Sequence, residues 1–73
     1  MSKPFISQTD ESLFIEVPGA GPCDIHLSCH EVLVDIVRTY EAQFAEGTLF
    51  SSDVTPEGEA AFMAAYNEVF PSV

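Results

Sequence analysis

Hydrophobic and polar residues alternate along the first third of the chain. The clearest run spans residues 13–17, where an aliphatic residue occupies every second position. A period of two places successive side chains on opposite faces of a strand, so this run predicts a half-buried strand. Residues 5–8 and 23–28 show the same alternation, and turn-forming residues separate the runs. We expect two or three strands. Their order stays open, because the segment from Pro4 either pairs with one or the other of its neighbours or lies loose.

The spacing of apolar residues changes to that of a helix at Ser28. Beyond it, apolar residues recur every three or four positions as far as Phe44. Ser28 and Glu31 have the S-x-x-E spacing of a capping box, in which each side chain binds the backbone amide of the other. Gly47 stands where a helix ends. The pattern predicts one helix over residues 29–46. Its apolar stripe comprises Leu33, Ile36, Val37, Tyr40 and Phe44, widened by Val32.

A second helix is predicted to begin after Thr55. Threonine is a preferred N-cap residue, and Pro56 suits the first helical position because its missing N–H would be unpaired there anyway. Pro71 stops the segment. Between the two helices, Leu49 and Phe50 are expected to lie in the core. The apolar stripe of the second helix comprises Phe62, Met63, Tyr66, Val69 and Phe70.

The order of these elements predicts the fold class. Strands followed by helices indicate an α+β domain, in which the helices pack against one face of a small antiparallel sheet. We therefore expect two or three strands followed by two amphipathic helices, in the order β-β-β-α-α. The 73 residues are expected to form one compact domain, 1–73. A chain of this length buries only about 60% of the surface that it exposes when unfolded, so its core is small.

Net charge is the strongest feature of the composition. Twelve acidic residues are balanced by two basic ones, Lys3 and Arg38, which gives a formal net charge of −10. Nucleic acids and anionic membranes are themselves negative, so we expect neither as a direct partner. A basic protein surface, including one that binds DNA or RNA, would attract this chain. An equally good interpretation is that the acidity serves solubility alone.

The chain shows no sign of export or of membrane insertion at the sequence level. No stretch approaches the ~20 apolar residues of a membrane span. The N-terminus lacks the apolar run of a signal peptide. Two cysteines in such a chain indicate reduced thiols. These features predict a cytoplasmic protein.

Cysteine and histidine are concentrated in residues 23–30, CDIHLSCH. Zinc needs three or four ligands that converge tetrahedrally. In a strand Cys23 and His26 point to opposite faces, and in a helix Cys29 and His30 lie about 100° apart. An extended segment also holds the two cysteines too far apart for a disulfide. We expect no metal and no cofactor, with Cys23 as a small buried residue.

Cys29 raises the alternative of nucleophilic catalysis. The first turn of a helix favours a thiolate, and His26 would be the candidate base. No residue is obviously placed to orient that base, and adjacent helix residues do not face each other. We therefore expect no catalytic residue, and an enzyme that uses Cys29 and His26 is the lesser alternative.

Two surface features are candidates for partner binding. The first is a set of acidic residues on the helices and the loop before the second helix, joined by Phe14, which points away from the aliphatic residues of its strand. These candidate partner contacts are Glu31, Asp35, Glu46, Asp53, Glu57, Glu68 and Phe14. The second is an alanine cluster that would let another helix approach closely, although alanine is also the best helix former. These candidate dimer contacts are Ala60, Ala61, Ala64 and Ala65.

These observations predict a small acidic, non-catalytic protein that docks on a basic surface of a larger protein and inhibits or modulates it. As a set, its acidic residues would imitate the phosphates of a nucleic acid. In length and composition the chain resembles the short accessory proteins of phages and mobile elements, including inhibitors of CRISPR complexes. The alternative is a structural or assembly subunit or chaperone, for example of a virion, that acts as a homo-oligomer such as a dimer.

Overall fold

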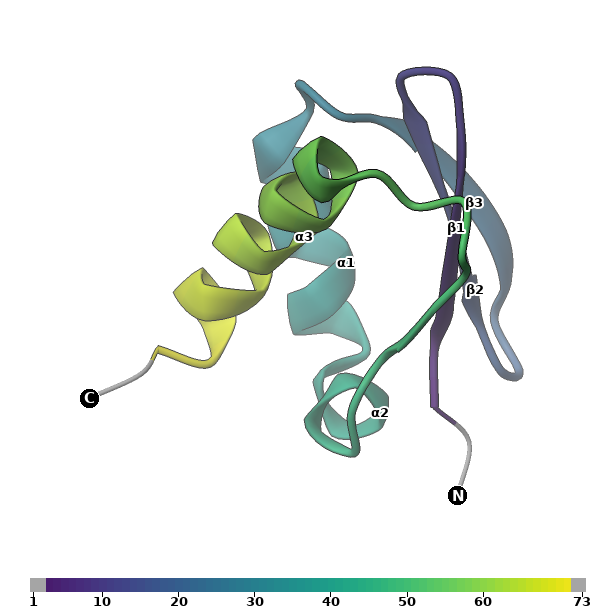
Figure 1. The fold of residues 1–73 in the computed structure, drawn as a ribbon. Coiled ribbons are helices and arrows are strands. Elements are labelled where there is room, and N and C mark those ends of the chain that lie inside the picture. Colours follow the sequence, from purple (N-terminus) through teal and green to yellow (C-terminus); the bar gives the residue numbers. More distant parts are fainter. Residues whose placement is uncertain (1–2, 72–73) are drawn as a thin grey trace.

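The chain folds as an α+β domain, as its element order predicts. The computed structural model describes residues 3–71, so residues 1–2 and 72–73 of the predicted domain lie outside the described residues. Three strands form an antiparallel sheet, and the helices that follow cover one face of it (Figure 1). The antiparallel strands are β1 (Phe5–Thr9), β2 (Ser12–Val17) and β3 (Gly21–His26). The helices are α1 (His30–Thr39), α2 (Glu41–Ala45) and α3 (Pro56–Val69).

The first strand pairs with the second, which decides between the alternatives that its sequence left open. The strands β1 and β2 are antiparallel, with Phe5 opposite Glu16 and Ile6 opposite Ile15. The strand β3 pairs with the other edge of β2. Every second residue therefore faces the helices, and the buried residues of the sheet include Ile6, Leu13, Ile15, Val17 and Ile25.

A short fourth strand, β4 (Leu49–Phe50), was not predicted. It runs parallel to β1 and completes the order β3-β2-β1-β4. The N–H of Leu49 donates to Pro4 O at 2.9 Å. The expectation that both residues lie in the core is wrong for Leu49, which is 49% exposed. Strand alternation explains the difference, because Phe50 packs against the core while its neighbour points outward.

The single helix predicted over residues 29–46 is wrong, because the chain bends at Tyr40. There the backbone leaves the helical region, with φ −111° and ψ 41°. The bend directs α2 so that Phe44 is fully buried, and its ring centroid lies 5.7 Å from that of Phe62. A straight and a bent helix share the same apolar stripe, so the period alone does not distinguish them. Gly47 follows α2 with a positive φ of 116°.

The predicted capping box is absent, whereas the second helix starts as predicted. The N-cap residue of α1 is Cys29, without a side-chain cap, so Ser28 lies one residue too early to cap the helix. The Ser28 hydroxyl instead contacts His26 Nδ1 at 2.8 Å. At α3 the Thr55 hydroxyl accepts a hydrogen bond from the Gly58 N–H at 3.0 Å.

The core lies between the inner face of the sheet and the helices α1 and α3, which pack together. Gly58, Phe62 and Ala65 form the buried side of α3. A Cβ at Gly58 would collide with Gln8 Oε1, so glycine permits this close approach to β1. Within residues 3–71, none of the helices combines the length and the apolar character needed to cross a membrane.

Candidate partner-binding surface

Acidic side chains gather around the connection from β3 to α1. A groove of about 280 Å³ lies between α1 and α3, and a second of about 330 Å³ lies beside the end of β3. A shallow hollow along residues 28–32 joins them. We call these three features together the junction surface. The first groove is lined by His30, Glu31, Val34, Asp35, Arg38 and Glu68. The second is lined by Glu11, His26, Leu27, Ser28, Glu57 and Ala61.

Helical spacing builds the first groove. Residues three and four apart on a helix are neighbours, which aligns Glu31, Asp35 and Arg38 along α1. Val34 is almost fully buried and forms the apolar base of the groove. The His30 ring contacts the Glu68 carboxylate of α3 through Nε2 and so ties the two helices together.

A hydrogen-bond chain builds the second groove. His26 Nε2 lies 3.2 Å from Glu11 Oε1, and both the hydroxyl and the N–H of Ser28 lie against His26 Nδ1. The backbone N–H donates, so Nδ1 is the acceptor and Nε2 carries the proton toward the carboxylate. This chain ties the β1–β2 turn to the end of β3.

The order serine, histidine, glutamate also occurs in hydrolase triads, but the setting here is different. The His26 and Glu11 side chains are 49% and 79% exposed. A catalytic serine depends on donors that stabilise an oxyanion in a site from which water is excluded. All three side chains are exposed, and the Ser28–His26–Glu11 contacts join the β1–β2 turn to the end of β3.

Both cysteines are free and exposed, so the expectation of a buried Cys23 is wrong. Register places Cys23 opposite Ile15, on the side of the sheet that the helices cover. The strand β3 lies at the edge of the sheet, and the helical cover does not reach this end of it. In the part of the chain that the structure describes, no three His, Cys, Asp or Glu side chains are grouped to hold a metal ion.

The predicted partner contacts divide among several places. Glu31, Asp35 and Glu68 meet in the first groove, and Glu57 lies in the second. Asp53 is exposed in the loop before α3, and Glu46 caps the C-terminal end of α2. Phe14 is half-buried on the face of the sheet away from the helices. The predicted set therefore contains the three carboxylates of the first groove, but its other members lie elsewhere on the molecule.

Sequence reasoning missed the contribution of Glu11 to the second groove. Its neighbour Ser12 pairs with His26, and this register brings Glu11 beside the histidine. The only signal in the sequence is the hairpin itself, since pairing across the turn determines which polar residues meet.

The predicted alanine cluster does not form one surface. Ala65 is fully buried in the core of its own chain, so its assignment as a dimer contact is wrong. Ala60 and Ala64 are exposed, and Ala61 lines the second groove. The reason is the helical period, because Ala65 lies three residues after the buried Phe62.

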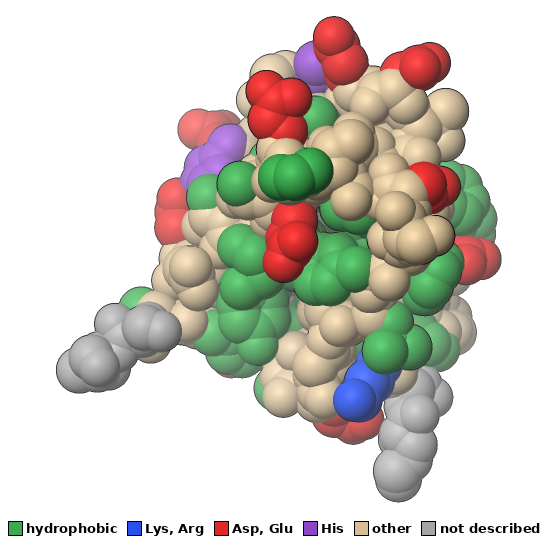
Figure 2. Space-filling model, in the orientation of Figure 1, with side chains coloured by type: hydrophobic (Ala, Val, Ile, Leu, Met, Phe, Trp, Pro, Cys, Tyr) green, Lys and Arg blue, Asp and Glu red, His purple; other side chains and the backbone are tan. Residues whose placement is uncertain are grey.

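The charge of the junction surface is strongly negative. Its two grooves bring together the carboxylates of Glu11, Glu31, Asp35, Glu57 and Glu68, with Arg38 as the one basic side chain lining them. Figure 2 shows acidic side chains next to both histidines and basic colour only at the lower edge of the visible face. Val32, 45% exposed, adds an apolar contact in the hollow between the grooves.

Comparison with known proteins does not extend these observations. No protein-family model, curated protein or solved structure matches the chain.

Proposed function

We propose that this protein is a non-catalytic binding module whose junction surface docks on a basic surface of a larger protein and inhibits or modulates that protein. The observation that carries the proposal is the gathering of five carboxylates around two adjoining grooves. They come from the β1–β2 turn, α1 and α3, so the fold itself assembles the set.

Charge and shape support a protein partner. A net charge of −10 attracts basic surfaces over long range and speeds their encounter. Shallow grooves with an exposed Val32 between them suit the side chains of a partner, since interfaces combine apolar contacts with a polar rim. Surfaces that bind DNA or RNA present lysine and arginine to phosphates, and carboxylates at this density compete for the same groups.

A pair of variants with equal charge tests the proposal. E31Q/D35N removes two carboxylates from the first groove, and E41Q/E59Q removes two from helix positions outside the junction surface. Both variants lose the same net charge. Immobilised protein captures partners from a lysate of its source cells, and mass spectrometry identifies them. Each captured partner is then purified, and its affinity for the three proteins is measured by titration.

The proposal predicts that E31Q/D35N binds a captured partner about fivefold or more weakly, whereas E41Q/E59Q changes affinity about twofold or less. It also predicts that binding weakens between about 50 mM and 500 mM salt and that duplex DNA or RNA displaces the protein from a partner that binds nucleic acid. Equal effects of the two variants would contradict it.

The same samples test the assembly alternative. A subunit that acts through apolar self-association would show a doubled or larger mass in light scattering at both salt concentrations. The proposed binding module is expected to have the mass of one chain at each concentration.

A further inference from the structure

The face of the sheet away from the helices is uncovered within residues 3–71 (Figure 1). We propose that this open face is a second docking surface, which binds a partner segment that presents arginine beside apolar side chains. This open face is separate from the junction surface, so an experiment can contradict one of the two proposals without contradicting the other.

Cross-strand register builds an apolar strip on the open face. Phe5 lies opposite Leu49 on one side, and these side chains are 38% and 49% exposed. Phe14 lies one row further along β2 and is half-buried. Exposed aromatic and aliphatic side chains that adjoin each other are typical of the centre of an interface.

Carboxylates border this strip. Glu16 lies opposite Phe5, and Asp24 lies opposite Phe14. Residues paired in this way on one face have Cβ atoms about 4.5–5.5 Å apart. A partner side chain that packs on either ring is therefore within reach of a negative charge.

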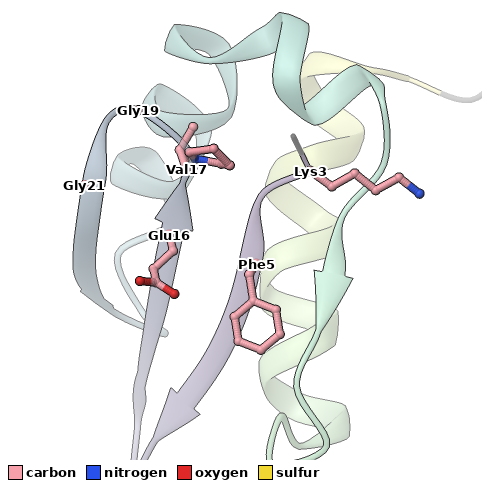
Figure 3. Close-up of a pocket in the computed structure, with 7 residues that line it drawn as sticks. Lys3, Phe5, Glu16, Val17, Gly19 and Gly21 are labelled. Carbon is pink, nitrogen blue, oxygen red and sulfur yellow. The ribbon is translucent and has the colours of Figure 1, made fainter. Parts of the chain in front are cut away.

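One end of the open face is hollowed into a pocket of about 330 Å³. The Phe5 ring and the Glu16 carboxylate project side by side from neighbouring strands, while the Lys3 side chain points away from Glu16 (Figure 3). Lys3 instead lies over Gly47, where an added Cβ would be 3.6 Å from its Nζ. Gly19 and Gly21 line the pocket without side chains to fill it.

This arrangement of ring and carboxylate matches arginine. A planar guanidinium stacks on an aromatic face and at the same time makes two parallel hydrogen bonds with a carboxylate. The lysine ammonium binds as a point charge and does not have this paired geometry. The pocket therefore favours arginine over lysine.

Two other occupants of the open sheet come into question, a second copy of this chain and an added β-strand. Charge opposes the first, and the residues at the sheet edges oppose the second. A second copy on this face would bring Glu16 and Asp24 against the same residues of a chain that also carries a net charge of −10. Strand addition at the edges is opposed by Pro22, which has no N–H to donate on β3, and by the two-residue length of β4. A basic segment of a different protein is the occupant that fits.

Synthetic peptides test the proposal directly. The probe is a ten-residue peptide in which arginine alternates with valine. Companion peptides replace every arginine by lysine, every arginine by glutamate, or every valine by serine. Two-dimensional amide NMR of the whole protein gives both the dissociation constant and the residues whose signals move.

The arginine–valine peptide is expected to move signals of β1, β2 and β4 and to bind more tightly than each companion. E16Q is expected to weaken binding about two- to fivefold, and F5S about fivefold or more. E59Q removes one carboxylate at an exposed position of α3 outside both surfaces, so it is the control with matched charge, and it is expected to change affinity less than about twofold. If F5S does not fold, L49S removes apolar surface from the same strip.

Three results would overturn the proposal. They are signal changes centred on α1 and α3, equal weakening by E16Q and E59Q, and equal affinity for the arginine and lysine peptides. Failure of the proposed function is recognised separately, because it concerns capture of a natural partner through the junction surface and is indifferent to E16Q.

Discussion

At the scale of single residues, Gly58 shows how one missing side chain positions a helix. Gln8 Oε1 accepts hydrogen bonds from the N–H of Thr55 at 2.9 Å and from its hydroxyl at 3.1 Å. A Cβ on Gly58 would occupy the place of that oxygen. The close approach of α3 to β1 and the hydrogen bonds that join them therefore depend on each other.

We predict that G58A destabilises the protein although alanine is the better helix former. Alanine gains about 1 kcal/mol in helix propensity. Displacing Gln8 loses two hydrogen bonds worth about 0.5–1.5 kcal/mol each and adds steric strain. The free energy of unfolding, measured by urea denaturation, is expected to fall by about 1 kcal/mol.

The double variant Q8A/G58A isolates the cause. Without the Gln8 amide, the nearest remaining atom to a Cβ at position 58 is Leu13 Cδ2, at the ordinary contact distance of 3.4 Å. G58A is therefore expected to be neutral or stabilising in a Q8A background, a coupling of about 1 kcal/mol or more. If G58A stabilised the otherwise unchanged protein, the collision with Gln8 would not be the deciding contact.

At the scale of elements, the two long helices begin in different ways. The helix α3 starts at a residue that caps it, whereas α1 starts at Cys29 without a side-chain cap. The start of α1 depends instead on the turn after β3, where the Cys29 N–H donates to His26 O at 3.0 Å. The start of α1 is thus determined by packing and by the preceding turn, whereas the start of α3 is also determined by the residue that caps it.

We predict that T55A lowers the free energy of unfolding by about 1–2 kcal/mol, because the Gly58 N–H loses its acceptor and Gln8 loses one donor. T55S keeps the hydroxyl and is expected to lose less than about 0.5 kcal/mol. Urea denaturation followed by circular dichroism measures both variants. Equal losses would assign the effect to the methyl group of threonine and would contradict the capping role.

At the scale of the whole molecule, charge repulsion and hydrophobic packing oppose each other. The protein measures 28 × 28 × 19 Å and carries a net charge of −10. At about 10 mM salt the screening length is about 30 Å, so every carboxylate acts on every other. Self-repulsion of this kind weakens the compact state.

We predict that sodium chloride stabilises the fold. Raising its concentration from about 10 mM to about 500 mM shortens the screening length to about 4 Å. If this relieves about 1 kcal/mol of repulsion, the melting temperature rises by roughly 4–8 °C. Thermal unfolding by circular dichroism measures the shift, and E41Q/E59Q, with two fewer negative charges, is expected to show a smaller one. A fall in melting temperature with salt would mean that attractive ion pairs outweigh the repulsion.

The sequence by itself determined the fold class and most element positions. Alternation along residues 13–17 and the pairing of threonine with proline at 55–56 are local signals, and both match the structure. A period of two or of 3.6 needs only near neighbours to be recognised. The acidic character of the surface also follows directly from composition.

Tertiary structure alone decided how these pieces meet. The strand β4 exists because residues 49–50 pair with residues 5–6, and the bend at Tyr40 exists because Phe44 packs against Phe62. The carboxylates of the junction surface come from residues as distant as Glu11 and Glu68. Such contacts depend on the packing of the whole chain, so they cannot be predicted from a local sequence pattern.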